Sequence, residues 1–327
     1  MNLGNCGTVA LEEPLVAWFD DALAHSATIS GGKGASLSRL KAAGLPVPRG
    51  FVVCAAAFST FLNQNGGGNL VLECLTCLDI YNDAELELTS SRIRDFILLQ
   101  PLSNALTKDI EEAYRGFGEE SLVAVRSSAI GEDGEAASFA GQQETFLNIR
   151  GADNVTRCVK ECWASFFTPR ALFYRAQKGE LTATLMAVVV QEMVFAEKSG
   201  VMFTVDPVQN RRDHIVVEAV FGLGEGVVSG LITPDQYVLD RASGSLVREF
   251  IALQPTAVVC DAIHGGTRHI QLSTEEGSAR VLNDRQVSGL RDMGLKVEAF
   301  FGSPQDVEWC ICGDELLLLQ SRPITTL

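Results

Sequence analysis

Basic residues, histidines and long apolar runs are all scarce in this sequence of 327 residues, and these shortages narrow its possible functions. Lys and Arg number 26 against 41 Asp and Glu, so the formal net charge is −15. Binding to nucleic acid or to an anionic membrane depends on a basic surface, and this charge argues against both. No apolar run reaches the roughly 18 residues needed to cross a bilayer. The N-terminal residues are acidic rather than basic, which is not typical of a secretory signal.

A disulfide framework is missing as well. The nine cysteines are an odd number, and their spacing forms no regular pattern. Cys74 and Cys77 form a C-x-x-C pair in a leucine-rich segment, with no second pair and no histidine close by. A zinc or redox site is one interpretation of this pair, but buried, reduced thiols are the better one. Together with the missing signal and spanning segments, this predicts a cytoplasmic protein.

The sequence does contain enough apolar residues for a large core, with 46% apolar and 20% charged residues. A chain of this length and composition forms one large or two modest domains. Apolar periodicity predicts helices near residues 103–117, 154–166, 169–178 and 284–301. The short, continuous apolar run 185–190 is typical of a strand buried on both faces.

Strands in the second half are expected to pair as hairpins. The expected pairs are 185–190 with 201–205, 235–241 with 246–251, and 306–312 with 316–320. The glycine-rich residues 64–69 are predicted to form a loop, and residues 14–24 a helix. The fold class is therefore predicted to be α+β, with an N-terminal lobe of residues 1–195 and a C-terminal lobe of residues 196–327.

One segment begins at the end of an expected strand and carries the strongest functional signal. Residues 122–125 are apolar and lead into Arg126 and two serines, and small residues follow before a strand resumes at 145–149. Small residues allow backbone N–H groups to approach phosphate oxygens, and an arginine at a strand end supplies a planar cation. The pattern favours a phosphate-binding segment. The alternative is a surface salt bridge from Arg126 to Glu132 or Asp133.

A second candidate for phosphate binding is Lys33, which lies in Gly31-Gly32-Lys33-Gly34 at the start of an expected helix. Backbone N–H groups and the helix dipole favour an anion at such a position. This is not a Walker A motif, because the spacing G-x-x-x-x-G-K-[ST] is absent. The alternative is an exposed lysine in a flexible first turn, and the residues alone do not choose between the two.

Glu308, Gln320 and Arg322 lie in the two final strands, where side chains alternate between faces with a period of two. A two-residue turn would pair Glu308 with Leu319 and place the three side chains on different faces. A three-residue loop, 313–315, would pair Glu308 with Gln320 and place all three on one face. A functional role for the set therefore predicts the three-residue loop. The side chains then expected to face the core are Trp309, Ile311, Leu317 and Leu319. The alternative is a salt bridge between Glu308 and Arg322, with Gln320 in solvent.

Residues 125–148 closely resemble part of a known ATP-binding domain. They include the stretches Val-Arg-Ser-Ser and Ser-Phe-Ala-Gly-Gln-Gln-Glu-Thr. This domain is shared by phosphoenolpyruvate synthase, pyruvate phosphate dikinase and rifampin phosphotransferase, a divergent ATP-grasp family. The likeness extends from Gly31 to Leu327. It implies a two-lobed ATP-grasp-like fold with the nucleotide in the cleft between the lobes. One departure is Ala129-Ile130-Gly131, where the family usually has Ala-Thr-Ala, so the threonine hydroxyl is missing.

The resemblance also implies roles for individual residues. Lys33, Arg126 and Arg322 are expected to be catalytic, because they would neutralise charge on the transferring phosphoryl group. Glu308 and Gln320 are expected to bind Mg²⁺ or Mn²⁺ through hard oxygen atoms. The residues expected to bind ATP are Lys33, Arg126, Ser138, Gly141, Gln142, Gln191, Glu192, Met193, Val194 and Glu218. Within this set, 138–142 would cover the phosphates as a lid and 191–194 would contact the adenine.

Enzymes of this family pass the β-phosphoryl group of ATP to a histidine on a separate swivelling domain and release AMP and phosphate. That histidine lies in a Gly-Gly-x-[ST]-x-His-[AS] motif. Of the four histidines in this sequence, His269 in Gly265-Gly266-Thr267-Arg268-His269-Ile270 is the near match. Its spacing is one residue short and no small residue follows it, so a hairpin turn is the simpler interpretation. The acceptor histidine is therefore expected on another polypeptide or on another part of a longer protein.

Three functions follow as hypotheses. In the first, the chain is the ATP-binding subunit of an enzyme resembling phenylphosphate synthase or 4-methylbenzyl phosphate synthase. Its partner would be a larger subunit with the phosphohistidine domain and a site for an aryl or benzyl alcohol such as phenol or 4-cresol. The start at Met1, the end after Pro323–Leu327 and an N-terminal lead suited to docking favour this hypothesis. In the second, the chain is the ATP domain of a single-chain phosphoenolpyruvate synthase or rifampin phosphotransferase. In the third, it is a non-catalytic nucleotide sensor, which the set of charged residues disfavours.

Overall fold

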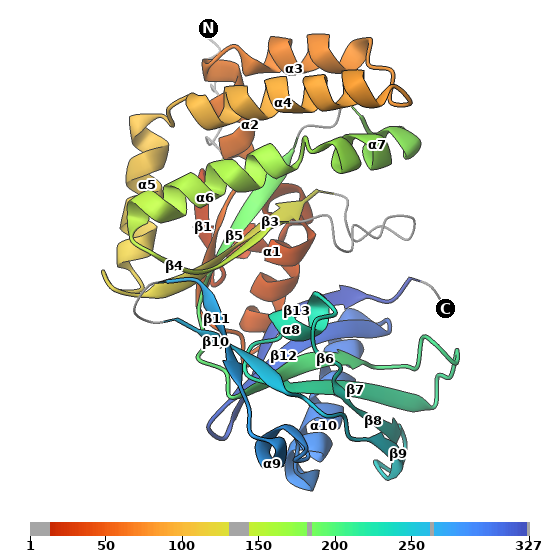
Figure 1. Cartoon of the computed structure of the whole chain (residues 1–327). Helices are drawn as coiled ribbons and strands as arrows, with labels where there is room; N and C mark the ends of the chain where they lie inside the picture. The colour runs from red at the N-terminus through yellow and green to blue at the C-terminus, as the bar shows by residue number, and fades with distance from the viewer. Residues whose placement is uncertain (1–13, 131–143, 182–184, 262–264, 326–327) are drawn as a thin grey trace, which may run out of the picture.

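Two larger β-sheets, one in each half of the sequence, form the framework of the protein (Figure 1). The structure is a computed structural model that describes residues 14–130, 144–181, 185–261 and 265–325. The predicted lid residues Ser138, Gly141 and Gln142 lie outside this part of the chain. The predicted mixture of helices and strands is confirmed.

The N-terminal sheet has five strands in the order β1-β2-β5-β3-β4, and every neighbouring pair is antiparallel. Its strands are β1 (Val16–Trp18), β2 (Gly50–Val53), β3 (Leu122–Ala129), β4 (Thr145–Arg150) and β5 (Met186–Glu192). β5 is buried along almost its whole length, as the apolar run predicts. Its side chains pack on both faces of the sheet, Val188 and Val190 in one core and Val189 in another.

Helices cover one face of this sheet (Figure 1). They are α2 (Ala55–Gln64), α3 (Gly67–Thr76), α4 (Asp83–Leu99), α5 (Asn104–Arg115), α6 (Ala152–Ser165) and α7 (Pro169–Gln177). The three helices predicted here, α5, α6 and α7, are confirmed. Ser103 and Thr168 accept hydrogen bonds from backbone N–H groups in the first turns of α5 and α7, which explains where these two helices begin. The predicted loop at 64–69 is wrong, because only residues 65 and 66 separate α2 from α3.

The opposite face is covered by α1 (Ala27–Ala42), which follows a short 3₁₀ helix, η1 (Ala22–His25). The predicted helix at 14–24 is wrong, since residues 16–18 form β1 and pair with β2. This strand adds to the sheet edge, where Trp18 packs edge-on against Phe51 and Phe117. The described part of the N-terminal lead is therefore part of the fold.

The C-terminal sheet has six strands in the order β13-β12-β6-β7-β8-β9. Its strands are β6 (Lys198–Phe203), β7 (His214–Phe221), β8 (Asp235–Asp240), β9 (Leu246–Phe250), β12 (Gln305–Cys312) and β13 (Glu315–Pro323). Helix α10 (Asp284–Phe301), at the predicted position, packs on one face over a core that includes Trp309 and Tyr237. A separate hairpin, β10 (Thr256–Cys260) and β11 (Thr267–Gln271), stands beside this sheet with the short helices α8 (Glu225–Val228) and α9 (Thr274–Gly277).

Two predicted hairpins are confirmed and one is wrong. β8 pairs with β9, and β12 pairs with β13. β5 and β6 do not pair, although they follow one another in the sequence. The edges of β5 are taken by β2 and β3, and those of β6 by β7 and β12, so residues 193–197 cross from one sheet to the other. This crossing coincides with the predicted boundary between 195 and 196, although the division into two units stays a prediction.

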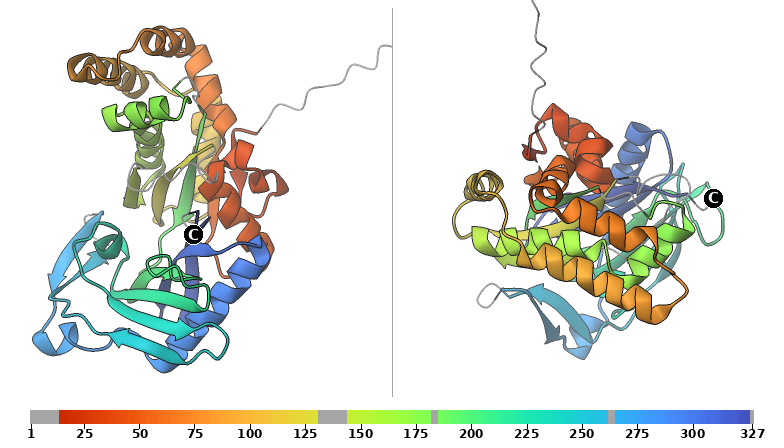
Figure 2. Two further views of the ribbon diagram at one scale, coloured as in Figure 1. Left: turned by 90° about the vertical axis from the view of Figure 1, so that its right-hand side faces the viewer. Right: turned by 90° about the horizontal axis from the view of Figure 1, so that it is seen from above.

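Helix α1 lies at the junction of the two halves (Figure 2). The hydroxyl of Ser36 donates a hydrogen bond to the carbonyl of Ser321 in β13, at 2.8 Å. Leu37 and Leu40 share one buried core with Val307 and Trp309 of the C-terminal sheet. The two halves are thus packed together along α1. No helix in the described ranges is both long and apolar enough to cross a bilayer.

Candidate functional site

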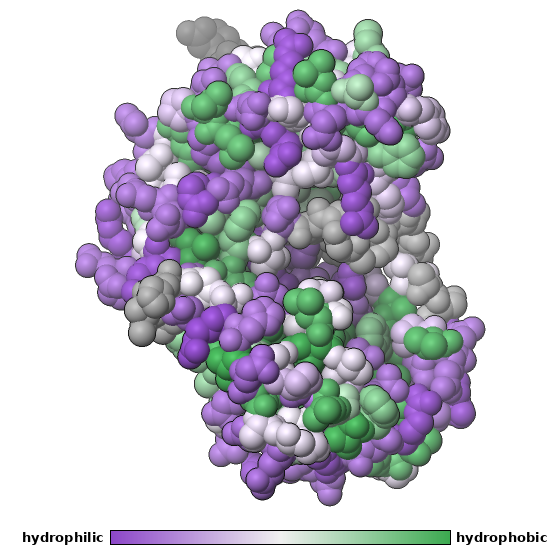
Figure 3. Space-filling model, viewed as in Figure 1, coloured by the Kyte–Doolittle hydropathy of each residue, from purple (hydrophilic) through white to green (hydrophobic). Residues whose placement is uncertain are grey.

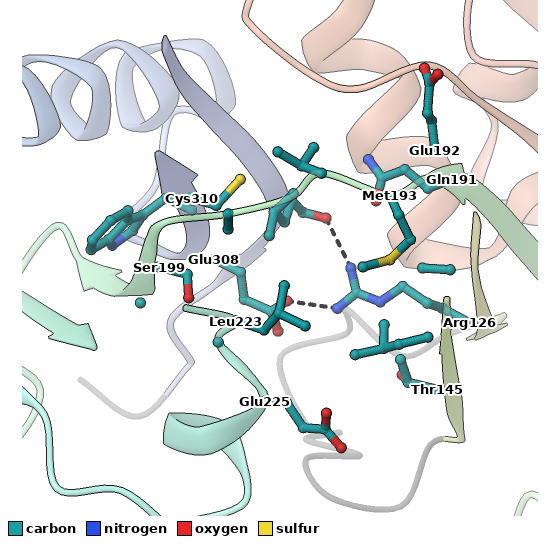
Figure 4. A pocket seen from close by; sticks show the side chains of 18 of the residues that line it. Arg126, Thr145, Gln191, Glu192, Met193, Ser199, Leu223, Glu225, Glu308 and Cys310 are labelled. Atoms are coloured by element: carbon teal, nitrogen blue, oxygen red, sulfur yellow. Dashed lines mark hydrogen bonds and ion pairs between the residues drawn. The ribbon is translucent and has the colours of Figure 1, made fainter. Parts of the chain in front are cut away.

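A pocket of about 260 Å³ lies between the two sheets, and the molecular surface is recessed there (Figure 3). One side of it comes from β3, β4 and the end of β5, and the other from β6, β12 and residues 223–229 (Figure 4). Most of the lining is apolar, with a few charged and polar side chains, which is the usual character of a small-molecule site.

Arg126 spans this pocket from one sheet to the other (Figure 4). It lies on β3, and its Nη2 is 2.6 Å from Glu308 Oε2 on β12. Its Nη1 donates a hydrogen bond to the backbone carbonyl of Leu319 on β13, at 3.0 Å. Within the described chain, its Nε is buried without a hydrogen-bond partner. The Arg126 side chain is 12% exposed, and it contacts one further residue of the predicted set, Glu308.

The final hairpin has the expected pairing of Glu308 with Gln320, but not the expected loop. The predicted three-residue loop is wrong, because Cys312 pairs with Glu315 across a two-residue turn. A β-bulge then shifts the register, so that Trp309 pairs with Leu318 and Glu308 pairs with Gln320. The extra residue is Leu319, whose carbonyl accepts the hydrogen bond from Arg126.

The predicted pairing of Glu308 with Gln320 is therefore confirmed, and Arg322 follows on the same face opposite Asp306. The bulge also changes which leucine enters the core. Leu318 is fully buried against Trp309, and the predictions for Leu317 and Leu319 are wrong. Leu319 lines the pocket instead.

The charges around Glu308 keep its carboxylate ionised. Burial alone raises its pKa, but Arg126, Lys33 and Arg322 more than offset this, and the pKa is lowered from its usual value. The proposed alternative, a salt bridge from Glu308 to Arg322, is wrong, because Arg322 Nη2 is 2.7 Å from Asp306 Oδ2. Burial raises the pKa of Asp306, although the contact with Arg322 opposes this. The site therefore combines a cluster of cations with one firmly ionised carboxylate.

Lys33 is positioned by a break in α1. Gly31 has φ 66°, which interrupts the helical backbone, and a Cβ atom there would lie 2.2 Å from the carbonyl oxygen of Ser128. The Ser128 hydroxyl donates to the carbonyl of Ser30 and accepts from the N–H of Gly34, so it holds this turn together. Lys33 Nζ donates to the carbonyl of Ser127, at 3.2 Å. The turn and the end of β3 thus place Lys33 near Glu308.

The segment 191–194 forms the other part of the pocket. All four residues line it, but their side chains differ in direction (Figure 4). Glu192 turns away and forms an ion pair with Arg49, at 3.0 Å. Gln191 lies opposite Ala124 of β3 and faces the pocket, and Met193 packs near Leu223.

Glu218 lies on the same face of the C-terminal sheet as Glu308, two strands away through Val201. Its carboxylate accepts a hydrogen bond from Gln236, at 3.3 Å, and it does not line the pocket. The residues that follow β7 do reach the pocket, through Leu223 and Glu225.

Several lining residues were not among the predicted set. Ala124 lies two residues before Arg126, and Cys310 lies two residues after Glu308. Because side chains two residues apart in a strand share a face, the sequence could have placed both of them in the pocket. Thr145, Leu147 and Leu319 have no such signal, because their approach depends on the crossing of the sheets and on the bulge.

A divalent cation fits the oxygen atoms at Glu308 and Gln320. Gln320 Oε1 is buried without a hydrogen-bond partner in the described part of the chain. No group of three or more His, Cys, Asp or Glu side chains suited to a metal occurs among the described residues. Mg²⁺ is usually bound by one or two protein oxygens together with phosphate oxygens, which this pair suits.

Comparison with known proteins gives a clear family assignment. Residues 27–327 match the family described as pyruvate phosphate dikinase, AMP/ATP-binding domain. The chain is 43% identical to a probable phosphoenolpyruvate synthase of Methanocaldococcus jannaschii over 95% of this chain and 27% of that protein. It is 44% identical to a probable phosphoenolpyruvate synthase of Methanothermobacter thermautotrophicus, over 95% of this chain and 46% of that protein.

A rifampicin phosphotransferase of Bacillus subtilis is 39% identical over 92% of this chain and 34% of that protein. The chain thus spans between about a quarter and a half of the length of these relatives. From the match over 27–327, the chain belongs to the pyruvate phosphate dikinase AMP/ATP-binding domain family.

Proposed function

We propose that the chain binds ATP in the pocket between the two sheets, as the ATP-grasp resemblance implies. The base would lie against residues 191–194, and the phosphates would lie beside Arg126, Lys33 and Arg322. The observation that carries this proposal is the ion pair of Arg126 and Glu308, which come from the two sheets and line one pocket, with Gln320 paired to Glu308 on the neighbouring strand.

The proposed reaction is transfer of the β-phosphoryl group of ATP to a histidine nitrogen. The P–O bond between the α- and β-phosphates breaks and a P–N bond to the histidine forms, with loss of the proton from that nitrogen. Water cleaves the P–O bond between the β- and γ-phosphates, so that AMP and phosphate are released. Arg126 would give up part of its contact with Glu308 in order to contact the phosphates. The three cations would stabilise the charge that develops on the transferring group.

The proposed metal is Mg²⁺ or Mn²⁺, held by Glu308 and Gln320 together with phosphate oxygens. When bound, such a cation supplies charge neutralisation and fixes the phosphate oxygens in place. Glu308 is suited to this because its low pKa keeps a hard, anionic oxygen available at neutral pH.

We propose that the acceptor histidine lies outside these 327 residues, on a larger partner subunit that phosphorylates an aryl or benzyl alcohol such as phenol or 4-cresol. The four histidines of the chain support an external acceptor, since none of them lies in the family motif. His269 forms part of β11, where it pairs with Val258 in a hairpin.

A second candidate is the ATP domain of a single-chain phosphoenolpyruvate synthase or rifampin phosphotransferase. The lengths of the relatives favour it, because this chain matches only 27–46% of the proteins named phosphoenolpyruvate synthase above. A non-catalytic nucleotide sensor is the third candidate. It is disfavoured by the retention of Lys33, Arg126, Glu308 and Arg322 together.

The test uses the full chain, ATP labelled in the β-phosphate, and a separate protein that carries a phosphohistidine domain. The chain alone should form AMP very slowly. With the acceptor present, AMP and phosphate should form, and an acid-labile, base-stable label should appear on the acceptor. Label on this chain, at His269 or elsewhere, would overturn the external acceptor, and ADP as the sole product would indicate a simple kinase.

The labelled acceptor then separates the first two candidates. Discharge of its label by phenol or 4-cresol supports the aryl alcohol phosphate synthase. Discharge by pyruvate or by rifampin, with no transfer to either alcohol, supports the single-chain enzymes.

A further inference from the structure

Asn148 of β4 combines deep burial with an unusual backbone conformation. It is only 1% exposed. Its φ of 57° lies in the left-handed region, which residues other than glycine rarely adopt. Among the described residues, the other non-glycine residue with a positive φ is Asn210, in the exposed turn between β6 and β7. Such a conformation persists only where the surrounding structure fixes it, and it often occurs near functional sites.

A β-bulge takes Asn148 out of the regular alternation of its strand. The register of β4 against β3 is shifted here, so residues 147 and 148 both lie opposite Ala124. A bulge of this kind bends the strand and changes the direction of a side chain. Leu147 lines the pocket, whereas Asn148 does not, and its amide contacts another part of the protein instead.

Both side-chain hydrogen bonds that the structure shows for Asn148 go to the β10–β11 hairpin, which reaches β4 from the C-terminal half (Figure 1). The Nδ2 atom donates to the carbonyl of Gly266, at 2.6 Å, and Oδ1 accepts from the thiol of Cys260. The backbone carbonyl of Asn148 also accepts from the N–H of Gly266, at 3.5 Å. Since the hairpin belongs to neither of the larger sheets, these contacts fix where it lies relative to the N-terminal sheet.

The same hairpin holds the wall of the pocket that comes from the C-terminal half. The carbonyl of Val258 accepts a hydrogen bond from the N–H of Leu223, at 2.8 Å. The hydroxyl of Thr267 donates to Oε2 of Glu225, at 3.0 Å. Leu223 and Glu225 both line the pocket. The hairpin therefore connects β4 of one half with two lining residues of the other.

One cross-strand pair of the hairpin carries both connections. Cys260 of β10 and Thr267 of β11 lie directly opposite each other. Side chains directly opposite in a sheet share a face. The contact with Asn148 and the contact with Glu225 are therefore made by neighbouring side chains. A displacement of the hairpin from β4 also displaces the partner of Glu225.

We infer that Asn148 is a positioning residue for the nucleotide. By holding the hairpin against β4, it sets the separation between Leu223 and Glu225 on one wall of the pocket and Arg126 on the other. This inference rests on the proposed binding of ATP between the two sheets. It assigns a role in binding to a residue that does not itself line the pocket.

The test measures the dissociation constant of ATP with Mg²⁺, by calorimetry, for the wild type and for Asn148→Gly. Glycine adopts a positive φ without strain, so this variant keeps the backbone of the bulge and loses both side-chain hydrogen bonds. Its dissociation constant should rise about three- to tenfold, the scale for one net hydrogen bond. Asn210→Gly is the matched control, because Asn210 has a φ of 51° but lies outside the pocket. It should bind ATP as the wild type does.

A second measurement separates positioning from a general loss of stability. Thr267→Val has a similar shape but lacks the hydroxyl that contacts Glu225, and it should also weaken ATP binding. Because both changes act through the hairpin, Asn148→Gly combined with Thr267→Val should weaken binding by less than the product of the two single effects. Cys260→Ala leaves β4 unchanged and provides a second way to release the hairpin, with the same expected non-additivity. Thermal unfolding checks that each variant is folded.

The outcomes separate this inference from the function on which it rests. If the wild-type protein does not bind ATP, the proposed function fails. If Asn148→Gly binds ATP as tightly as the wild type, or if its effect multiplies fully with that of Thr267→Val, the inference is overturned while ATP binding stands.

Discussion

Arg126 illustrates at the scale of one residue how the site depends on both sheets. Its guanidinium group contacts Glu308 and the carbonyl of Leu319, and it is almost fully shielded from water. We predict that Arg126→Ala and Arg322→Ala each slow phosphoryl transfer by at least ~100-fold, the scale for removing one preorganised charge donor. ATP binding through the base should be largely retained.

The measurement is the rate of AMP formation with the acceptor protein present. Arg115→Ala is the control, because Arg115 forms an exposed ion pair with Glu111 on α5 and lies outside the pocket. A rate near that of the wild type in either site variant would contradict the assignment of that arginine.

The lowered pKa of Glu308 predicts a pH dependence of stability. A carboxylate with a lowered folded-state pKa stabilises the fold above its usual pKa of 4.5, and this contribution is lost as the pH falls through the lower, folded-state value. Glu308→Gln should therefore reduce the free energy of unfolding at pH 7 by roughly 1–3 kcal/mol. The difference from the wild type should shrink below about pH 4.5.

Denaturant unfolding of both proteins from pH 3 to pH 7 gives this difference directly. The comparison is needed because Asp306, with its raised pKa, acts in the opposite direction in the wild-type profile. Glu112→Gln is the control, since Glu112 forms an exposed ion pair with Lys108. A constant difference at all pH values would show that the charge of Glu308 is not its source.

At the scale of elements, the start of α1 depends on one close contact. Gly31 and Gly44 lie near the two ends of this helix and have similar φ values of 66° and 75°. A Cβ at Gly31 would meet the carbonyl oxygen of Ser128 at 2.2 Å, whereas one at Gly44 meets nothing within 4 Å. Gly44→Ala should cost about 1 kcal/mol through backbone conformation alone.

Gly31→Ala should cost a further 1–3 kcal/mol, roughly, because the turn must move away from β3. It should also weaken ATP binding, since the same turn positions Lys33. The free energies of unfolding of the two variants, measured side by side, test this. Equal losses in both would mean that the contact with Ser128 relaxes without cost.

At the scale of the whole molecule, contacts beyond the pocket also join the two halves. Asn148 of β4 donates a hydrogen bond to the carbonyl of Gly266 and accepts one from Cys260, both in the β10–β11 hairpin. A nucleotide that contacts both sheets would add to these connections. We predict that ATP with Mg²⁺ stabilises the protein by about 2.7 kcal/mol at 100 times its dissociation constant.

An excess of chelator should remove much of this stabilisation, and Glu308→Gln should make it less dependent on the metal. Thermal unfolding with ATP, with and without Mg²⁺, provides the measurement, and AMP formation should lose the same metal dependence. Full activity and an unchanged unfolding midpoint in excess chelator would argue against a metal at Glu308 and Gln320.

Local patterns were sufficient for several helices and strands. The spacing of apolar residues located α5, α6, α7 and α10, because each of these helices buries one face and begins at a recognisable residue. The N-terminal strand β1 was missed because three residues carry too little periodicity to separate a strand from a helix. Local patterns also could not show that β5 and β6 do not pair, since three of the four strands beside them, β2, β3 and β12, lie far away in the sequence.

The sequence by itself determined the family and the types of residue available to bind phosphate and metal. It also predicted the pairing of Glu308 with Gln320, from the requirement that Glu308, Gln320 and Arg322 lie on one face of the hairpin. Only the tertiary structure decided how that pairing arises, through a bulge at Leu319 rather than a longer turn. It also decided that Arg126 of the N-terminal sheet forms an ion pair with Glu308 of the C-terminal sheet. The physical reason is that strand periodicity acts along one chain segment, whereas these contacts depend on how two sheets, joined through residues 193–197, pack against each other.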